Sequence, residues 1–187
     1  MIEKKEEVLF QTLRYLSDKG LKFTMADLAK SLGMSKKTIY SFFETKEALL
    51  NDVVDYAFRS IKLKEKDILA RDDLSLIAKV RSLVIALPDK FDSLNWGRIE
   101  GLSEKYPKVY KKIKRNLESD WGDTIKLLEE GKDLGLFKDF QIIVFKTMTE
   151  SCIEKFLSSS VLEENGMSYV EGLEGMINIL LEGIVVR

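Results

Sequence analysis

Histidine is absent from this 187-residue sequence. Its absence removes the commonest general base in catalysis, the histidine-containing triads and the commonest metal ligand. The plentiful carboxylates form no marked acid/base pair, and no glycine-rich phosphate loop or metal-ligand spacing is found. The sequence therefore predicts no catalytic residues, no metal site and no cofactor, and it disfavours an enzyme.

Cysteine and long apolar runs are also scarce. The single cysteine, Cys152, excludes an internal disulfide and fits a reducing compartment. No uninterrupted apolar run approaches the ~20 residues that a membrane helix needs. The first residues, "MIEKKEEVLF", lack the form of a secretory signal. With 45% apolar and 33% charged residues, we expect a soluble, cytoplasmic protein without a membrane partner.

Proline and glycine number only two and 11, and helix-forming residues dominate, which predicts an all-α fold. Apolar residues at helical spacing predict about nine helices. The first ends near Gly20, where a left-handed residue closes a helix. The others are expected over residues 25–32, 36–42, 46–69, 74–87, 95–103, 107–131, 140–160 and 168–186.

The segment "MADLAKSLGMSKKTIYSFFETKEALL", residues 25–50, contains two short helices around a glycine turn. Ala29, Gly33 and Ile39 match the helix-turn-helix pattern, with a small residue at the helix contact, a glycine in the turn and a branched residue on the second helix. The remaining polar side chains then face outward near the start of the second helix, which is the end that enters the major groove of DNA. These outward residues are Lys36, Lys37, Thr38, Tyr40 and Ser41.

At this point the sequence resembles the TetR family of bacterial transcriptional regulators. The resemblance rests on "FTMADLAKSLGMSKKTIYSFFETKEALL", with the order Ser35, Thr38, Tyr40 and with Lys46 opening the next helix. It implies a three-helix DNA-binding domain over residues 1–46 and a larger helical domain for effector binding and dimerisation over 47–187. Lys37 departs from the family pattern, where a small residue is more usual, so no relative's operator can be transferred.

The resemblance also implies roles for individual residues. Lys36, Lys37 and Thr38 are expected to reach base edges or nearby phosphates. Tyr40 and Lys46 are expected to hold the DNA backbone. The complete predicted DNA-binding set is Thr24, Ser35, Lys36, Lys37, Thr38, Tyr40, Ser41 and Lys46. The alternative is an ordinary solvated face on which Ser35 and Thr24 only cap helices.

Large aromatic and soft residues lie on helices that, in similar proteins, line an effector pocket. The predicted ligand-binding set is Phe58, Trp96, Trp121, Ile125, Met148 and Cys152. Each of them is also compatible with an ordinary core position.

The last two predicted helices carry an excess of apolar residues, which favours a homodimer through a four-helix bundle. The residues concerned are Ile153, Phe156, Leu157, Met176, Ile177, Leu180 and Ile184; the alternative is that they only close the core of one subunit.

The leading hypothesis is a homodimeric regulator, in most such proteins a repressor, that binds a palindromic DNA operator and is released by a small apolar or aromatic ligand. A second hypothesis is a DNA-binding interaction protein of the same fold without a small-molecule effector. A third is an enzyme built on a helical bundle, which the missing histidine disfavours.

Overall fold

The computed structural model describes residues 2–94, 96 and 101–186, and almost all of its regular structure is helical. The all-α prediction is confirmed. No strand occurs in the described ranges, where one isolated antiparallel bridge joins Phe137 and Val185. The helices are α1 (Ile2–Lys19), η1 (Gly20–Lys22), α2 (Met25–Ser31), α3 (Lys36–Phe42), α4 (Lys46–Leu69), α5 (Leu76–Val84), η2 (Asp89–Phe91), α6 (Leu102–Lys105), α7 (Pro107–Ser119), α8 (Gly122–Asp133), α9 (Ile142–Ser158), α10 (Val161–Glu164) and α11 (Tyr169–Ile184).

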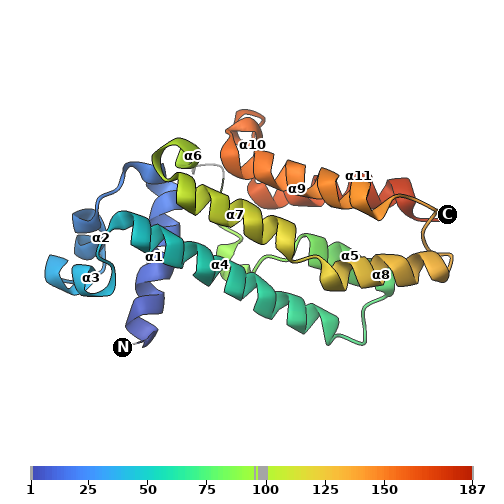
Figure 1. Cartoon of the computed structure of the whole chain (residues 1–187), viewed down its shortest axis with the longest axis horizontal. Coiled ribbons are helices and arrows are strands. Elements are labelled where there is room, and N and C mark those ends of the chain that lie inside the picture. Colours follow the sequence, from blue (N-terminus) through green and yellow to red (C-terminus); the bar gives the residue numbers. More distant parts are fainter. Residues whose placement is uncertain (1, 95, 97–100, 187) are drawn as a thin grey trace.

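The molecule is elongated, with α1, α2 and α3 forming a small head at one end (Figure 1). Helix α4 leaves this head and runs through the larger body, where it lies beside α7. Helices α9 and α11 pack together and lie on the side of α7 and α8 that faces away from α4. A 24-residue helix of ~1.5 Å rise per residue spans ~36 Å, so α4 can carry a displacement in the body to the head.

Side-chain caps fix where several of these helices begin. The Thr45 hydroxyl accepts a hydrogen bond from Ala48 N at 3.0 Å and starts α4. Ser75 and Ser168 act in the same way at α5 and α11. Because each cap satisfies a backbone N–H that has no partner inside the helix, it stabilises that end by ~1 kcal/mol.

Two apolar clusters fill the interior. The first joins the head to the near half of the body, because buried Leu28 and Ile39 of the head belong to the same cluster as Val53, Phe91 and Val109. The second lies farther from the head and centres on Val80, Leu128 and Ile177 among others. The head is therefore packed onto the body by continuous apolar contact rather than held only by α4.

The structure divides the helix predicted over residues 107–131 into α7 and α8. Asp120 leaves helical geometry, with φ −120° and ψ 56°. Ser119, Asp120 and Gly122 are all weak helix formers, so a break costs least at this point. The helix predicted over 95–103 lies mostly outside the described residues, and α6 begins only at Leu102. The four-residue α6 and α10 were not anticipated as separate elements.

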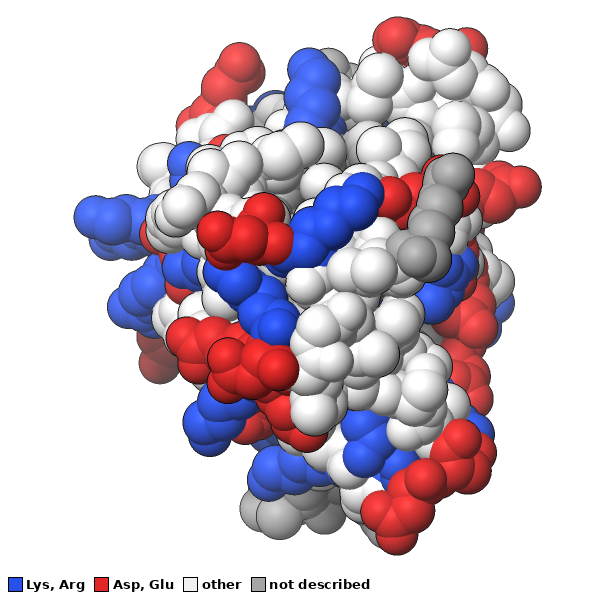
Figure 2. All heavy atoms as spheres, turned by 90° about the vertical axis from the view of Figure 1, so that its right-hand side faces the viewer, with Lys and Arg blue, Asp and Glu red and all other residues white. Residues whose placement is uncertain are grey.

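Charge is mixed at the end of the body remote from the head. Figure 2 shows Lys and Arg side chains alternating with Asp and Glu there, with uncharged side chains between them. This face therefore carries no broad surface of one sign. None of the helices in the described part of the chain combines the length and the apolar character needed to cross a membrane.

Candidate nucleic-acid interface and ligand cavities

The turn between α2 and α3 depends on Gly33, which has a left-handed φ of +61°. Gly33 N–H donates to Lys30 O at 3.2 Å, and Met34 N–H donates to Ala29 O at 2.9 Å. These two bonds close the end of α2 as in the Schellman arrangement. A Cβ at Gly33 would meet no atom within 4 Å, so the backbone conformation, and not crowding, favours glycine here.

Helix α3 begins at its cap, Ser35. The Ser35 Oγ accepts a hydrogen bond from Thr38 N at 3.1 Å and lies 2.8 Å from Thr38 Oγ1. Ile39 is fully buried and anchors α3 against the rest of the head. Ser35 and Thr38 therefore both hold the start of the helix whose outer face is the candidate reading surface.

The outer face of α3 is polar and exposed, as predicted for four of its residues. Lys36, Lys37 and Ser41 are exposed, and the Tyr40 side chain is 49% exposed. Thr38 is only half-exposed because its hydroxyl turns back to Ser35. Two ammonium groups and a phenol are therefore on the solvent side of a helix whose opposite side is anchored by the buried Ile39.

Thr24 and Asp27 form a capping box at the start of α2. Asp27 N donates to Thr24 Oγ1 at 3.1 Å, and Asp27 Oδ2 accepts from Thr24 N at 2.9 Å and from Thr24 Oγ1 at 2.7 Å. Hydrogen bonds from the Thr24 hydroxyl and backbone lower the pKa of Asp27. Sequence reasoning identified the Thr24 cap but overlooked Asp27, although its position three residues later is the signature of such a box.

Lys46 is held within the head. Its ammonium donates to Leu21 O at 2.7 Å and to Phe23 O at 2.5 Å, and it lies 3.9 Å from the centre of the Phe23 ring. Burial, followed by the positive charge of Lys105, lowers the pKa of Lys46. In this structure Lys46 therefore fastens the start of α4 to the segment before α2. The contact with DNA that the family resemblance implies stays a prediction.

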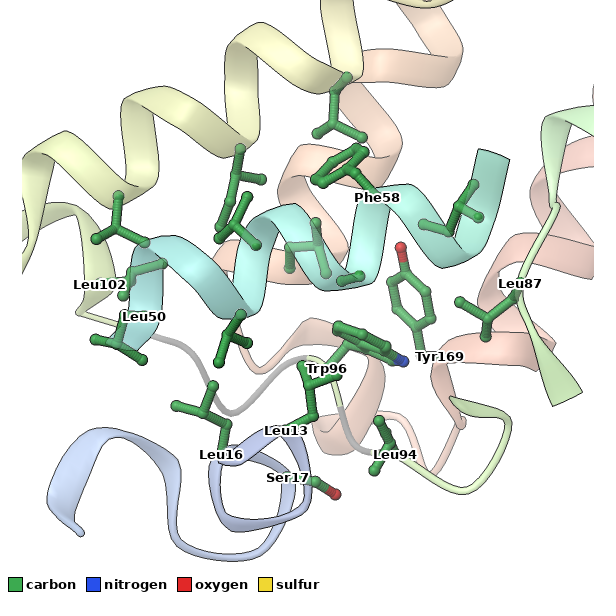
Figure 3. A pocket seen from close by; sticks show the side chains of 18 residues that line it. Leu13, Leu16, Ser17, Leu50, Phe58, Leu87, Leu94, Trp96, Leu102 and Tyr169 are labelled. Carbon is green, nitrogen blue, oxygen red and sulfur yellow. The ribbon is translucent and has the colours of Figure 1, made fainter. Parts of the chain in front are cut away.

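A first cavity of about 110 Å³ lies where the head meets the body. Its walls are almost entirely apolar and come from α1, α4, α6, α7, α9 and α11. Figure 3 shows Leu13 and Leu16 of α1 on one side of it, Phe58 of α4 on another, and Trp96 beside Tyr169. The rings of Trp96 and Tyr169 are 6.0 Å apart between centres. The Trp96 Nε1 is buried without a hydrogen-bond partner among the described residues.

A second cavity of about 110 Å³ adjoins the first on the side away from the head. The two cavities share five lining residues: Phe58, Ile61, Leu87, Leu117 and Tyr169. The second is more polar, because Lys62, Glu65, Asn116 and Asp120 also line it. Each volume is somewhat below the ~150 Å³ of an engineered apolar cavity that admits benzene, so a larger ligand has to occupy both.

The structure separates the predicted ligand-binding residues. Phe58 and Trp96 line the first cavity, and Phe58 and Trp121 line the second. Ile125, Met148 and Cys152 line neither cavity. Met148 is 49% exposed on the outer side of α9. We therefore leave these three out of the proposed ligand site.

Sequence reasoning also missed several lining residues. Leu13, Leu16 and Ser17 belong to α1, which the sequence assigns to the head, so no local signal places them at a cavity. Lys62, Glu65 and Asp120 read as ordinary surface charges in the sequence. Lys62 and Glu65 are neighbours on α4, and the packing of α4 against the end of α7 brings Asp120 to them.

The outer face of α9 and α11 is apolar, and Leu180 and Ile184 of the predicted set lie at it, whereas two other predicted residues are buried. Met176 and Ile177 are 7% and 0% exposed, so they close the core of their own subunit. The most exposed large apolar residues of these two helices are Ile143, Val144, Met148 and Ile179, which the sequence did not single out for the dimer interface. A shallow apolar groove beside them is lined by Phe140, Val144, Phe145, Met148, Leu180 and Ile184, together with Gln141.

Comparison with known proteins finds similarity in the N-terminal segment and along most of the chain. Residues 8–53 match the family of bacterial regulatory proteins, tetR family. The chain is 27% identical over 179 residues to the uncharacterized HTH-type transcriptional regulator YvaF of Bacillus subtilis (strain 168), an alignment that covers 96% of this chain and 94% of that protein.

Solved structures show the same fold at low identity. The ketosteroid transcriptional regulator KstR2 of Mycobacterium tuberculosis superimposes with a TM-score of 0.63 at 15% identity, over 98% of this chain and 96% of that one. A transcriptional regulator from Saccharomonospora viridis, solved in complex with choline, has a TM-score of 0.59 at 21% identity over the whole of both chains.

The matched segment contains the capped α2, the Gly33 turn and the exposed face of α3, and the fold continues through the body in the solved structures. Residues 8–53 thus match the tetR family of bacterial regulatory proteins, and the whole chain has the fold of solved TetR-family transcription regulators.

Proposed function

We propose that this protein is a homodimeric repressor that acts in the cytoplasm, binds a palindromic DNA operator through α3, and is released by a small ligand bound in the two cavities of its body. The observation that carries the DNA-binding part is the exposed face of α3, on which Lys36, Lys37 and Tyr40 project while Ile39 is fully buried. Lysine ammonium groups can reach guanine O6 or N7 or a phosphate, and a tyrosine hydroxyl can donate to a phosphate.

The proposed DNA-binding set keeps its predicted members, with roles refined by the contacts. Lys36, Lys37, Tyr40 and Ser41 are proposed to touch DNA directly. Ser35 and Thr38 are proposed to hold the start of α3. Thr24 and Lys46 are proposed to border this surface, and their present contacts set the positions of α2 and α4.

The homodimer is proposed to form through the outer face of α9 and α11. Ile143, Val144, Met148 and Ile179 expose between 49% and 73% of their side chains on this face. A two-fold axis through it would bury the same apolar patch of both subunits. Such a dimer carries one α3 per subunit, and the two must match half-sites about one helical turn, ~34–36 Å, apart.

Ligand release is supported by the position of the first cavity. Leu13 and Leu16 of α1 and Val53 of α4 line it, so a ligand there touches the two helices that hold the head. To change the spacing of the heads, the ligand must bind the mismatched state more tightly than the matched one. A shift from 1:99 to 99:1 needs ~5.5 kcal/mol of differential affinity. Burial of ~200 Å² of apolar ligand surface supplies ~5 kcal/mol in total, of which only the part lost in the matched state contributes.

The relatives support the general scheme. The Saccharomonospora viridis regulator of the same fold was solved with choline, and the Mycobacterium tuberculosis protein is described as a ketosteroid regulator. Regulators of this fold thus accommodate small molecules.

The division into a DNA-binding domain over 1–46 and an effector and dimerisation domain over 47–187 remains our proposal. The first apolar cluster crosses that boundary.

The central test is selection of bound sequences from random duplex DNA. Recovery of a palindrome with half-site centres about one turn apart is expected. On the selected DNA, Lys36→Ala and Lys37→Ala should each reduce the slope of log affinity against log salt by about one, if each lysine neutralises one phosphate. Lys126→Ala, at a lysine of α8 whose side chain is 78% exposed, is the matched control and should leave the slope unchanged.

A base contact behaves differently from a phosphate contact. Loss of one should cost ~1–3 kcal/mol at particular operator positions and leave other positions unaffected. Wild-type affinity in the Lys36→Ala, Lys37→Ala, Tyr40→Phe triple variant would contradict the assignment of α3 as the reading helix.

A further inference from the structure

The second cavity combines aromatic walls with an acidic rim. Phe58, Trp121 and Tyr169 line it. The Trp121 Nε1 donates to Leu117 O at 2.9 Å, so its polar edge is already satisfied within the protein. Aromatic faces attract organic cations through the negative charge of the ring face, and groups of such faces are the usual recognition site for ammonium groups.

The charged side chains that line this cavity, within the described ranges, are Lys62, Glu65 and Asp120. They sum to one net negative charge. The Lys62 ammonium lies between the two carboxylates: it forms an ion pair with Glu65 and another with Asp120, in which Nζ and Oδ2 are 2.5 Å apart. Lys62 is therefore the resident cation of an acidic site.

The first cavity supplies a complementary apolar space. Phe58 and Tyr169 line both cavities, so a ligand that passes between them reaches from the acidic rim into the space between α1, α4 and α7. Figure 3 shows Tyr169 extending from beside Trp96 toward α4, the helix that carries Phe58. Among the described residues, none that lines the first cavity has a charged side chain. An apolar chain or ring fits there, whereas a second charge does not.

We propose that the effector is an organic cation with an apolar tail, whose ammonium group takes the place of the Lys62 ammonium between Glu65 and Asp120 while its tail fills the first cavity. This inference rests on the proposed ligand release. The Glu65 side chain is 19% exposed and that of Asp120 is 52% exposed, so the head group of the ligand would be held at a partly open rim. Lys62 then acts as a built-in competitor, and a carboxylate ligand is disfavoured by the two acidic side chains.

Three probes with the same tail test the sign of the charge: hexyltrimethylammonium, hexanol and hexanoate. Binding is measured by calorimetry and by the fluorescence of Trp96 and Trp121, the two tryptophans of the chain. We expect the ammonium probe to bind most tightly and hexanoate most weakly. Because partly exposed ion pairs have modest energies, the preference for the ammonium over hexanol should be about threefold to tenfold.

Substitutions at the rim give the sharper result. Lys62→Met removes the competing cation and should strengthen binding of the ammonium probe, whereas Glu65→Gln and Asp120→Asn should weaken it. Hexanol should be little affected by any of the three. Lys126→Met makes the same change at an exposed lysine that lines neither cavity, and it should alter none of the affinities. Thermal unfolding confirms that each variant is folded.

The opposite pattern would overturn the inference. If hexanoate binds most tightly, or if Lys62→Met weakens binding of the ammonium probe, Lys62 is an anion ligand and not a competitor. If none of the three probes binds to the wild-type protein, the cation assignment also fails. Operator binding is measured on the same samples, so DNA binding that persists in that case leaves the repressor proposal standing.

Discussion

Replacement of Ile179 by aspartate should dissociate the proposed dimer. The Ile179 side chain is 73% exposed on α11, the largest exposed fraction among the large apolar residues of the chain described by the structure. Complete burial of a side chain of this size contributes ~1.5–3 kcal/mol, so burial of the exposed part contributes ~1–2 kcal/mol. A two-fold interface buries it twice, which makes ~2–4 kcal/mol per dimer.

This loss corresponds to a dissociation constant about 30- to 700-fold higher, at ~1.4 kcal/mol for each tenfold change. The figure is a lower bound for Ile179→Asp, because two carboxylates would also lose water at the interface. Association itself costs ~4–15 kcal/mol, so an interface built on a few apolar side chains tolerates little loss.

Sedimentation velocity across a concentration series measures the effect. Leu63→Asp is the matched control, because Leu63 is a 58% exposed leucine of α4, away from α9 and α11. We expect a dimer for the wild type and for Leu63→Asp, and a monomer for Ile179→Asp at micromolar concentration. A wild-type monomer under these conditions, or an unchanged dimer in Ile179→Asp, would refute the argument that this face joins two subunits.

Three further predictions concern the head and the body. Hydrogen bonds from Thr24 lower the pKa of Asp27 below its ordinary value of 3.8, so the stability gained from the capping box is complete above pH ~4 and is lost as the pH falls through the lowered pKa. In urea titrations at several pH values, Asp27→Asn should therefore reduce the loss of stability at low pH. Lys46→Met removes two charge-assisted hydrogen bonds of a partly exposed ammonium, and we expect the free energy of unfolding to fall by ~1 kcal/mol and operator affinity to fall with it; unchanged values of both would show that this anchor is dispensable. A Cβ on Gly131 would lie 2.2 Å from the Phe137 ring, so Gly131→Ala should lower the melting temperature by several degrees, and the double variant with Phe137→Leu should recover part of that loss.

The sequence by itself determined the parts of the protein that depend on local interactions. The Gly33 turn, the Ser35 cap and the buried Ile39 are all set by residues within a few positions of one another, and the structure has them as the pattern predicted. The same holds for the all-α class and for the outward face of α3. A helix cap or a left-handed glycine needs only neighbouring residues to act, so its signal survives in the linear sequence.

Tertiary structure alone decided which face of each helix meets another element. Ile177 and Ile179 are two positions apart on α11, yet the first is fully buried and the second is 73% exposed, because α11 packs against α9 and α5 on one side only. Lys62 lies on α4 and Asp120 directly follows α7, and they form an ion pair only because α4 meets the end of α7. Apolar periodicity shows that a helix has a buried face, but the partner of that face, and any cavity left between the two, depends on contacts between residues far apart in the chain.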